Sequence, residues 1–165
     1  MRVVSDSSPL ILLARIGQLE LLPRLYQRVA ITPQVHHEVV VDGEGLAGSA
    51  EIEAAKWIDI QSVSNPDDLS GAQQESSLGA GELSTILLGK EIQAELVLLD
   101  EIKARKLAAE HGLTVLGCVG VLEDAFLAQL LTDIRNAYQK LLASGAYIDP
   151  KILEKSLRSL NLPSL

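Results

Sequence analysis

Four acidic residues stand beside short apolar or helical segments of this chain: Asp6, Glu38, Glu82 and Asp100. Asp6 comes directly after the apolar run at residues 2–5, and Asp100 comes directly after the apolar run at residues 96–99. In open α/β sheets, ligand sites lie outside the carboxyl ends of the strands. If the carboxylates converge there, we expect them to bind Mg²⁺ or Mn²⁺, because these hard cations take oxygen ligands.

Such a site is suited to metal-assisted hydrolysis, for example of a phosphate ester. A metal-bound water would lose its proton to a neighbouring carboxylate and attack phosphorus in line with the departing oxygen. We expect Asp6 and Asp100, at strand ends, to be the rigid ligands. Glu38 and Glu82, on helices, would hold the metal through water or act as the general base. The sequence leaves open whether one or two ions bind.

Each of these acids also has a purely structural interpretation. Asp6 is suited to cap the helix that follows it, and Asp100 is suited to cap the next helix along the chain. Glu82 lies in the first turn of a helix, where the helix dipole favours any acid. Glu38 alone reads as an exposed helical residue. The set of four, rather than any single member, favours a site.

Alternating strand and helix patterns predict the framework that would position the acids. Short apolar runs predict strands at residues 2–5, 29–31, 58–63, 96–99 and 113–116. Helical signals, including a cap followed by proline at Ser8-Pro9 and at Thr32-Pro33, predict helices at residues 9–15, 19–26, 34–41, 49–57, 82–91, 101–111, 119–131, 134–144 and 150–160. Residues 64–81 are almost free of apolar side chains and predict a long loop. This order predicts an α/β fold with a central parallel sheet of four or five strands and right-handed crossovers.

Length, composition and charge limit the class of protein. The 165 residues predict one domain, residues 1–165, with a C-terminal helical extension from about residue 133 to 165. One cysteine, Cys118, excludes an internal disulfide framework, and no signal-peptide pattern or membrane-length apolar run is present, so we expect a cytoplasmic protein without membrane contact. The net charge of −8 argues against nucleic-acid binding unless bound cations neutralise part of it.

Other candidate residues carry weaker signals. His36 and His37 adjoin Glu38, but neighbouring helical residues point about 100° apart, so we expect solvated histidines rather than shared ligands. Arg105 follows Glu101 by four residues, the spacing of a helical ion pair, and is also placed to meet Asp100 or a substrate phosphate. For Cys118 we expect burial among apolar residues.

The order of these motifs resembles the PIN-domain nucleases, and most closely their small prokaryotic PIN-like branch. The resemblance covers nearly the whole chain and rests on Asp6-Ser7-Ser8-Pro9, Pro33 to Glu38, Gly81-Glu82, Leu98 to Glu101 with Arg105, and Gly117 to Gly120. It implies a three-layer α/β/α fold, metal-dependent cleavage of RNA, and frequently a toxin role opposed by a small antitoxin protein.

Carried over position by position, the resemblance assigns site roles to particular residues. It implies metal-binding acids at Asp6, Glu38, Glu82 and Asp100, a small polar pair at Ser7 and Ser8, and support from Glu101 and Arg105. Glu82 departs from the wider family, where aspartate is usual at this helix.

Two functions stay open at this point. One is a metal-dependent ribonuclease, and the other is a non-catalytic binding or interaction protein that keeps the acidic pocket. A phosphatase of another doubly wound class would need an aspartate two residues after Asp6, where Ser8 stands. The apolar stripe of residues 152–160 is expected to pack on the core; if that helix overhangs, the stripe predicts a homodimer or an antitoxin surface.

Overall fold

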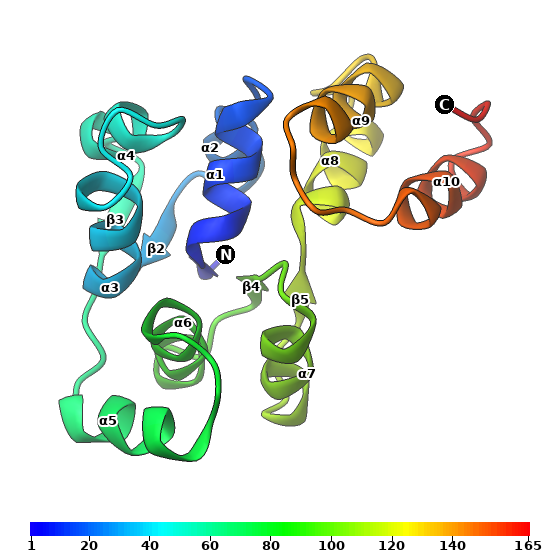
Figure 1. Cartoon of the computed structure of the whole chain (residues 1–165). Helices are drawn as coiled ribbons and strands as arrows, with labels where there is room; N and C mark the ends of the chain where they lie inside the picture. The colour runs from blue at the N-terminus through cyan, green and yellow to red at the C-terminus, as the bar shows by residue number, and fades with distance from the viewer.

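The computed structural model describes residues 1–165 as a parallel sheet with helices on both faces (Figure 1). The strands are β1 (Val3–Ser5), β2 (Val29–Ile31), β3 (Ile58–Ile60), β4 (Leu96–Leu98) and β5 (Val115–Leu116). They form one five-stranded sheet in the order β3-β2-β1-β4-β5, and every neighbouring pair is parallel. The predicted α/β fold with a central parallel sheet is confirmed.

Helices fill each connection between strands. They are α1 (Ser7–Arg15), α2 (Leu21–Tyr26), α3 (Pro33–His36), the π-helix η1 (His37–Val41), α4 (Ser49–Ala54), α5 (Pro66–Glu75), α6 (Ala80–Glu91), α7 (Ile102–Glu110), α8 (Cys118–Leu127), α9 (Ile134–Ala143) and α10 (Pro150–Ser159). The last three follow β5: α8 contacts α1 and α2, and α9 and α10 pack on α8 (Figure 1).

Alternating side chains of the strands divide the core into layers. In β4, Leu98 faces a large cluster that includes residues of α1, α2 and α8, whereas Val97 faces a smaller cluster with α6 and α7. In β1, Val3 joins the large cluster and Val4 joins Leu88 of α6. Because successive strand residues point to opposite faces, both faces of the sheet are covered by helices.

The chain reverses its direction across the sheet between β1 and β4. From β1 it proceeds through β2 to β3 on one side, and from β4 to β5 on the other. The two strands are in register, with Ser5 opposite Leu98, and the backbone N–H of Asp6 donates to the carbonyl of Leu98 at 3.0 Å. A reversal of this kind leaves a crevice at the carboxyl ends of the two strands.

The prediction of a loop over residues 64–81 is wrong in its first half, where α5 forms. Asn65 caps this helix by accepting from the backbone N–H of Asp67 at 3.0 Å, and Pro66 lies in the first turn. Only Leu69 of α5 is buried, so the helix has no apolar stripe from which it could be recognised. The cap followed by proline, which also opens α3 at Thr32-Pro33, was the available signal.

Several predicted boundaries also shift. The first helix begins at Ser7 with Asp6 in the N-cap position, two residues earlier than the Ser8-Pro9 signal predicted. The strand predicted at 58–63 ends at Ile60, and the helix predicted at 34–41 changes from α-helix to π-helix at His37. π-helical turns are frequent at functional sites, and this one carries Glu38.

The C-terminal helices pack on the core, as the default interpretation of their apolar stripe predicted. Leu153 and Leu157 of α10 are fully buried. The hydroxyls of Tyr138 in α9 and Ser156 in α10 share a buried hydrogen bond of 2.6 Å. No helix of the chain combines the length and apolar character needed to cross a bilayer.

Candidate active site

Asp6 and Asp100 lie side by side at the switch point of the sheet. Asp6 follows β1 directly, and Asp100 follows β4 after one further buried residue, Leu99. The register of the two strands therefore places both carboxyl groups at the same edge. Both residues lie where the rule for open α/β sheets predicts a ligand.

Asp6 is almost fully buried, at 3% exposure, although it carries a carboxyl group. It holds the N-cap position of α1, but its side chain makes no capping hydrogen bond, and its Oδ1 atom has no partner. The interpretation of Asp6 as a helix cap is therefore wrong. A buried carboxylate oxygen without a hydrogen bond is costly, unless another group such as a cation supplies the missing interaction.

Glu38 reaches the same region from the opposite side of the crevice. Its Oε2 accepts a hydrogen bond from the hydroxyl of Ser7, the residue after Asp6. Its carboxylate also lies against the Cα atom of Gly81 at the start of α6, because a Cβ atom there would stand 2.5 Å from Glu38 Oε1. Glu38 thus links α1, η1 and α6, and only glycine at position 81 leaves room for it.

Glu82 stands one residue further along α6. Its Oε2 accepts from the backbone N–H of Gly79 at 3.1 Å, so it also closes the first turn of the helix. The predicted structural role of Glu82 at the helix start is present, and the side chain remains half-buried within the acidic group.

Asp100 and Glu101 have different surroundings, although they are neighbours. Asp100 Oδ1 accepts from the backbone N–H of Cys118 at 2.8 Å, whereas its buried Oδ2 has no partner. The cap of α7 is Glu101, whose Oε2 accepts from the N–H of Ala104 at 2.8 Å. The interpretation of Asp100 as the helix cap is therefore wrong, because the following residue takes that role.

The supporting residues predicted from the sequence differ in whether they contact the acids. Ser7 contacts Glu38, whereas Ser8 is half-buried in the first turn of α1 and makes no hydrogen bond to the acids. Arg105 forms no ion pair with Glu101; its guanidinium lies beside Gly117 and lowers the pKa of Asp100. Cys118 is buried, as expected.

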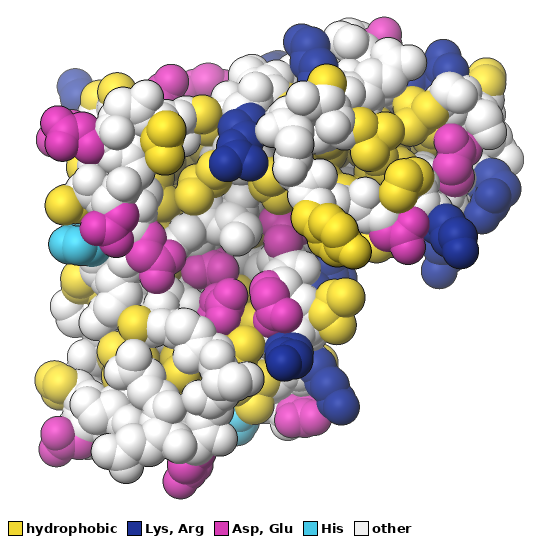
Figure 2. Space-filling model, in the orientation of Figure 1, with side chains coloured by type: hydrophobic (Ala, Val, Ile, Leu, Met, Phe, Trp, Pro, Cys, Tyr) yellow, Lys and Arg dark blue, Asp and Glu magenta, His cyan; other side chains and the backbone are white.

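Burial and mutual repulsion shape the charge state of the acids. Burial, followed by the charges of Glu82, Glu38 and Asp100, raises the pKa of Asp6 from 3.8 to about 7. The pKa of Glu82 is raised by burial and then by the charges of Glu101 and Glu38. Burial also raises the pKa of Asp100, against the lowering effects of the Cys118 N–H and Arg105. The acids therefore share one electrostatic environment. Figure 2 shows acidic side chains gathered in the middle of the face in view.

These residues fit a hard divalent cation. The free oxygens of Asp6 and Asp100 supply hard ligands, and burial raises the pKa of both carboxyl groups, so a bound cation would stabilise their ionised forms. No group of three or more acidic, histidine or cysteine side chains is arranged to hold one ion by itself. Mg²⁺ tolerates this arrangement, because it keeps several waters and uses one or two carboxylates together with substrate phosphate.

Two glycines at the site were not assigned a role from the sequence beyond their motifs. A Cβ atom on Gly81 would strike the Glu38 carboxylate, and one on Gly117 would stand 2.7 Å from Asp100 Oδ1 and from Arg105 Nη1. Their place beside acids in the motifs was the only signal, and the clash with side chains distant in sequence is visible only in the folded chain.

A parallel α/β sheet with acids gathered at its switch point defines the class of this protein. The chain belongs to the PIN-domain family, since the family model DUF3368, a PIN domain, matches residues 2–162. The PIN domains form a nuclease-like superfamily, and the resemblance found from the motifs is thereby confirmed.

A solved structure supports the fold. A PilT N-terminus domain protein from the hyperthermophilic archaeon Sulfolobus solfataricus P2 aligns with a TM-score of 0.52 and 14% identity, over 90% of this chain and 98% of that one. No curated protein sequence matches this chain significantly.

Proposed function

We propose that this chain is an endoribonuclease that depends on Mg²⁺ or Mn²⁺. The observation that carries the proposal is the pair of buried carboxyl groups at the switch point, Asp6 and Asp100, each with an oxygen that lacks a partner. Divalent-metal dependence is typical of PIN domains. RNA is the substrate implied by the resemblance to PIN-domain nucleases.

The residues of the site would divide the work as follows. Asp6 and Asp100 would hold the ion, which supplies an acidified water and neutralises charge on the phosphate. Glu38, held by Ser7, would orient a water of the ion's shell. Glu82, half-buried and close enough to Asp6 for its charge to act there, would accept the proton of the attacking water.

Substituting the two switch-point acids tests this activity. Asp6→Asn and Asp100→Asn should each lower Mn²⁺- or Mg²⁺-dependent cleavage of single-stranded RNA by roughly 100-fold or more, the loss of about 3 kcal/mol of transition-state stabilisation. The matched control is Glu110→Gln, an exposed acid at the end of α7. Cleavage that survives both aspartate changes would contradict the proposal.

For the biological role we propose a toxin opposed by a small antitoxin protein, as the family resemblance implies. Expression of the wild-type chain should arrest growth of a bacterial host, and expression of the Asp6→Asn variant should not. Growth arrest by both would show that toxicity does not depend on cleavage at this site. Relief of the arrest by a small protein encoded next to this chain would identify the antitoxin.

We also propose that the protein forms a homodimer through its C-terminal helices. Leu127, Leu142 and Ile152 of α8, α9 and α10 are exposed apolar side chains, at 67, 38 and 51%. Sedimentation equilibrium should give twice the chain mass of 17.7 kDa. A monomer at micromolar concentration would contradict this assembly.

One observation favours the second candidate, a non-catalytic binding protein with an acidic pocket. Glu38 and Glu82 already accept hydrogen bonds from Ser7 and Gly79, and no three side chains form a ready cage for an ion. Calorimetric titration with Mn²⁺ separates the two candidates. Binding that is lost in Asp6→Asn supports the nuclease, whereas no binding and no cleavage support the second candidate.

A further inference from the structure

A second hollow adjoins the acids on the side of α1. It has a volume of about 240 Å³ and is lined by residues of α1, of η1 and of the segment that follows η1: Ile11, Arg15, Glu38, Val39, Asp42, Gly43, Leu46 and Ala47. Glu38 belongs both to this hollow and to the acidic group. A ligand that enters the hollow would therefore touch the site of the proposed chemistry.

The walls of this hollow combine apolar surface with a single cation. Ile11, Leu46 and Ala47 provide the apolar part, and Leu46 is 68% exposed although it is large and apolar. Arg15 is the only basic side chain in the lining. Asp42, the second acid of the lining besides Glu38, is paired with Nδ1 of His37 at 3.3 Å.

Helix α1 connects the hollow to the acids. Its N-terminus follows Asp6 and contacts Glu38 through Ser7, and Arg15 lies in its last turn. The rise of an α-helix puts these two ends about 12 Å apart. Ile11 and Arg15 are four residues apart and therefore face the same way. A strand with one phosphate at the acids would run along α1 past Ile11 toward Arg15.

We propose that this hollow is a nucleotide subsite, in which Ile11 and Leu46 contact the base next to the cleaved phosphate and Arg15 binds the following phosphate. This inference rests on the proposed ribonuclease function and adds how the substrate is held. Single-stranded RNA presents unstacked bases that pack on exposed side chains, and the planar guanidinium of arginine suits a phosphate.

Size and charge favour this occupant over others. Pockets for drug-sized ligands run from about 300 to 1,000 Å³, so a hollow of about 240 Å³ fits one base rather than a folded peptide segment. A chain with a net charge of −8 needs a local cation to hold a polyanion beside its own acids, and Arg15 is placed to supply it.

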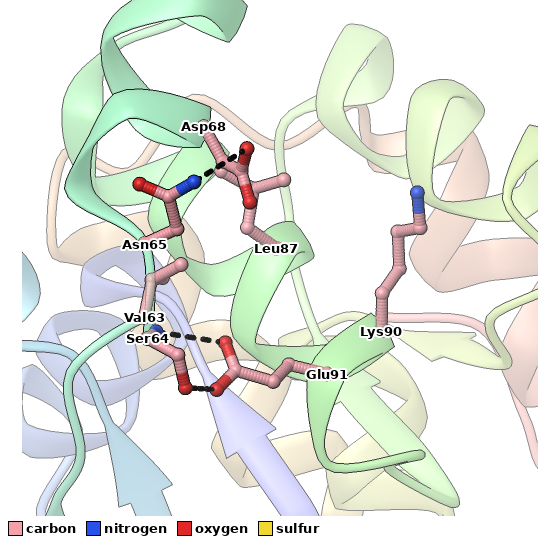
Figure 3. Close-up of a pocket in the computed structure, with 7 residues that line it drawn as sticks. All are labelled: Val63, Ser64, Asn65, Asp68, Leu87, Lys90 and Glu91. Atoms are coloured by element: carbon pink, nitrogen blue, oxygen red, sulfur yellow. Dashed lines mark hydrogen bonds between the residues drawn. The ribbon is translucent and has the colours of Figure 1, made fainter.

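Another cavity of the chain does not share these features. It has a volume of about 410 Å³ and lies between the segment before α5 and the C-terminal half of α6 (Figure 3). Ser64 donates to Glu91 through its backbone N–H and its hydroxyl, and Lys90 points away from the other side chains in Figure 3. None of the four candidate acids lines it.

Two substitutions with matched controls test the subsite. Leu46→Ser and Arg15→Gln should each weaken binding of fluorescent hexauridylate and hexaadenylate by roughly threefold to tenfold, measured in an Asp100→Asn background that prevents cleavage. Tyr147→Ser, at a fully exposed side chain, and Arg158→Gln, in the last turn of α10, should change binding less than about twofold. Arg15→Gln should also reduce the salt dependence of binding by about 0.7 in the log–log slope, the share of one phosphate on a single strand.

A second readout separates this inference from the proposed function. Mn²⁺ binding, measured by calorimetry without RNA, should be lost in Asp6→Asn and retained in the control variant Arg158→Gln. RNA affinity that is unchanged in both Leu46→Ser and Arg15→Gln would overturn the subsite, even if Asp6-dependent cleavage is intact. A protein segment would then be the alternative occupant of the hollow. Weakened affinity without any cleavage by the wild-type chain would support the subsite while the proposed nuclease failed.

Discussion

At the scale of single residues, the acids of this site differ in how their charge is compensated. Asp6 and Asp100 each keep one buried oxygen without a partner, whereas Glu38 and Glu82 accept hydrogen bonds from Ser7 and Gly79. An unpartnered buried carboxylate destabilises the folded chain when ionised. A bound cation would therefore stabilise the folded chain most at these two aspartates.

The raised pKa of Asp6 makes stability depend on pH. Its pKa is about 7 in the folded chain against 3.8 in a model peptide, so the folded state binds the proton more tightly. The stabilisation from this proton is complete below about pH 4 and is lost as the pH rises to about 7, at most about 4 kcal/mol. We expect Mg²⁺ to raise the melting temperature more at about pH 8 than at about pH 5, because the ion replaces the lost proton.

Thermal unfolding of two variants checks this explanation. Asp6→Asn should be more stable than the wild type at about pH 8 and should lose most of the Mg²⁺ response, because the buried charge is gone. Glu110→Gln, a change at an exposed acid, should behave like the wild type. An equal Mg²⁺ shift at both pH values would show that Asp6 is not the linked group.

Gly81 is the second residue with a sharp prediction. Gly81→Ala should reduce cleavage by roughly tenfold or more, because the new methyl group would displace the carboxylate of Glu38. Gly71→Ala is the matched control, since nothing lies within 4 Å of its Cβ position in the middle of α5. It should keep full activity and gain about 0.5 to 1 kcal/mol of stability, measured by urea denaturation. Full activity of Gly81→Ala would show that Glu38 does not need its observed position.

The types and order of the site residues were predictable from the sequence, but their partners were not. The sequence offered two adjacent acids, Asp100 and Glu101, and Asp100 was the one suited to cap the next helix. The folded chain gives the cap to Glu101 and leaves Asp100 facing the crevice. That choice depends on the backbone N–H of Cys118, which β5 brings close to Asp100 from 18 residues away.

At the scale of elements, the cap of α7 separates structural from catalytic acids. Glu101→Ala should cost about 1 kcal/mol of stability, since the Ala104 N–H loses its partner, and should keep most of the cleavage activity. Asp100→Asn should show the reverse: its stability should change little, and almost none of its cleavage activity should remain. Urea denaturation and RNA cleavage of the two variants check this assignment. Loss of activity in Glu101→Ala without loss of stability would instead place Glu101 in the catalytic group.

The elements that sequence reasoning missed are those without an apolar pattern. Strands and helices with buried stripes, such as β4 and α9, lie close to their predicted positions. Helix α5 buries only Leu69, and its polar composition predicted a loop. The π-helical turn of η1, which lies against α1 and α4, was not predicted from the sequence either.

At the scale of the whole molecule, the strand order explains why distant acids meet. Asp6 and Asp100 are far apart in sequence but follow neighbouring strands, because β4 pairs with β1 and not with β3. Two crossover connections then bring η1 and α6, with Glu38 and Glu82, to the same edge. The alternation of strands and helices predicted a parallel sheet, but it did not contain the order of the strands.

The C-terminal helices provide the last test, because the sequence predicted them to extend a single domain. Leu157 is fully buried between α10 and the rest of the large core cluster, so Leu157→Ala should lower the free energy of unfolding by about 2 to 5 kcal/mol. Lys155→Ala on the same helix, at an exposed side chain, should cost less than about 1 kcal/mol. RNA cleavage per folded molecule should be unchanged in both, because none of the candidate acids lies on α10. A single urea transition that shifts with Leu157→Ala would place α10 in the same cooperative unit as the sheet, whereas a separate early transition would make residues 133–165 an independent unit.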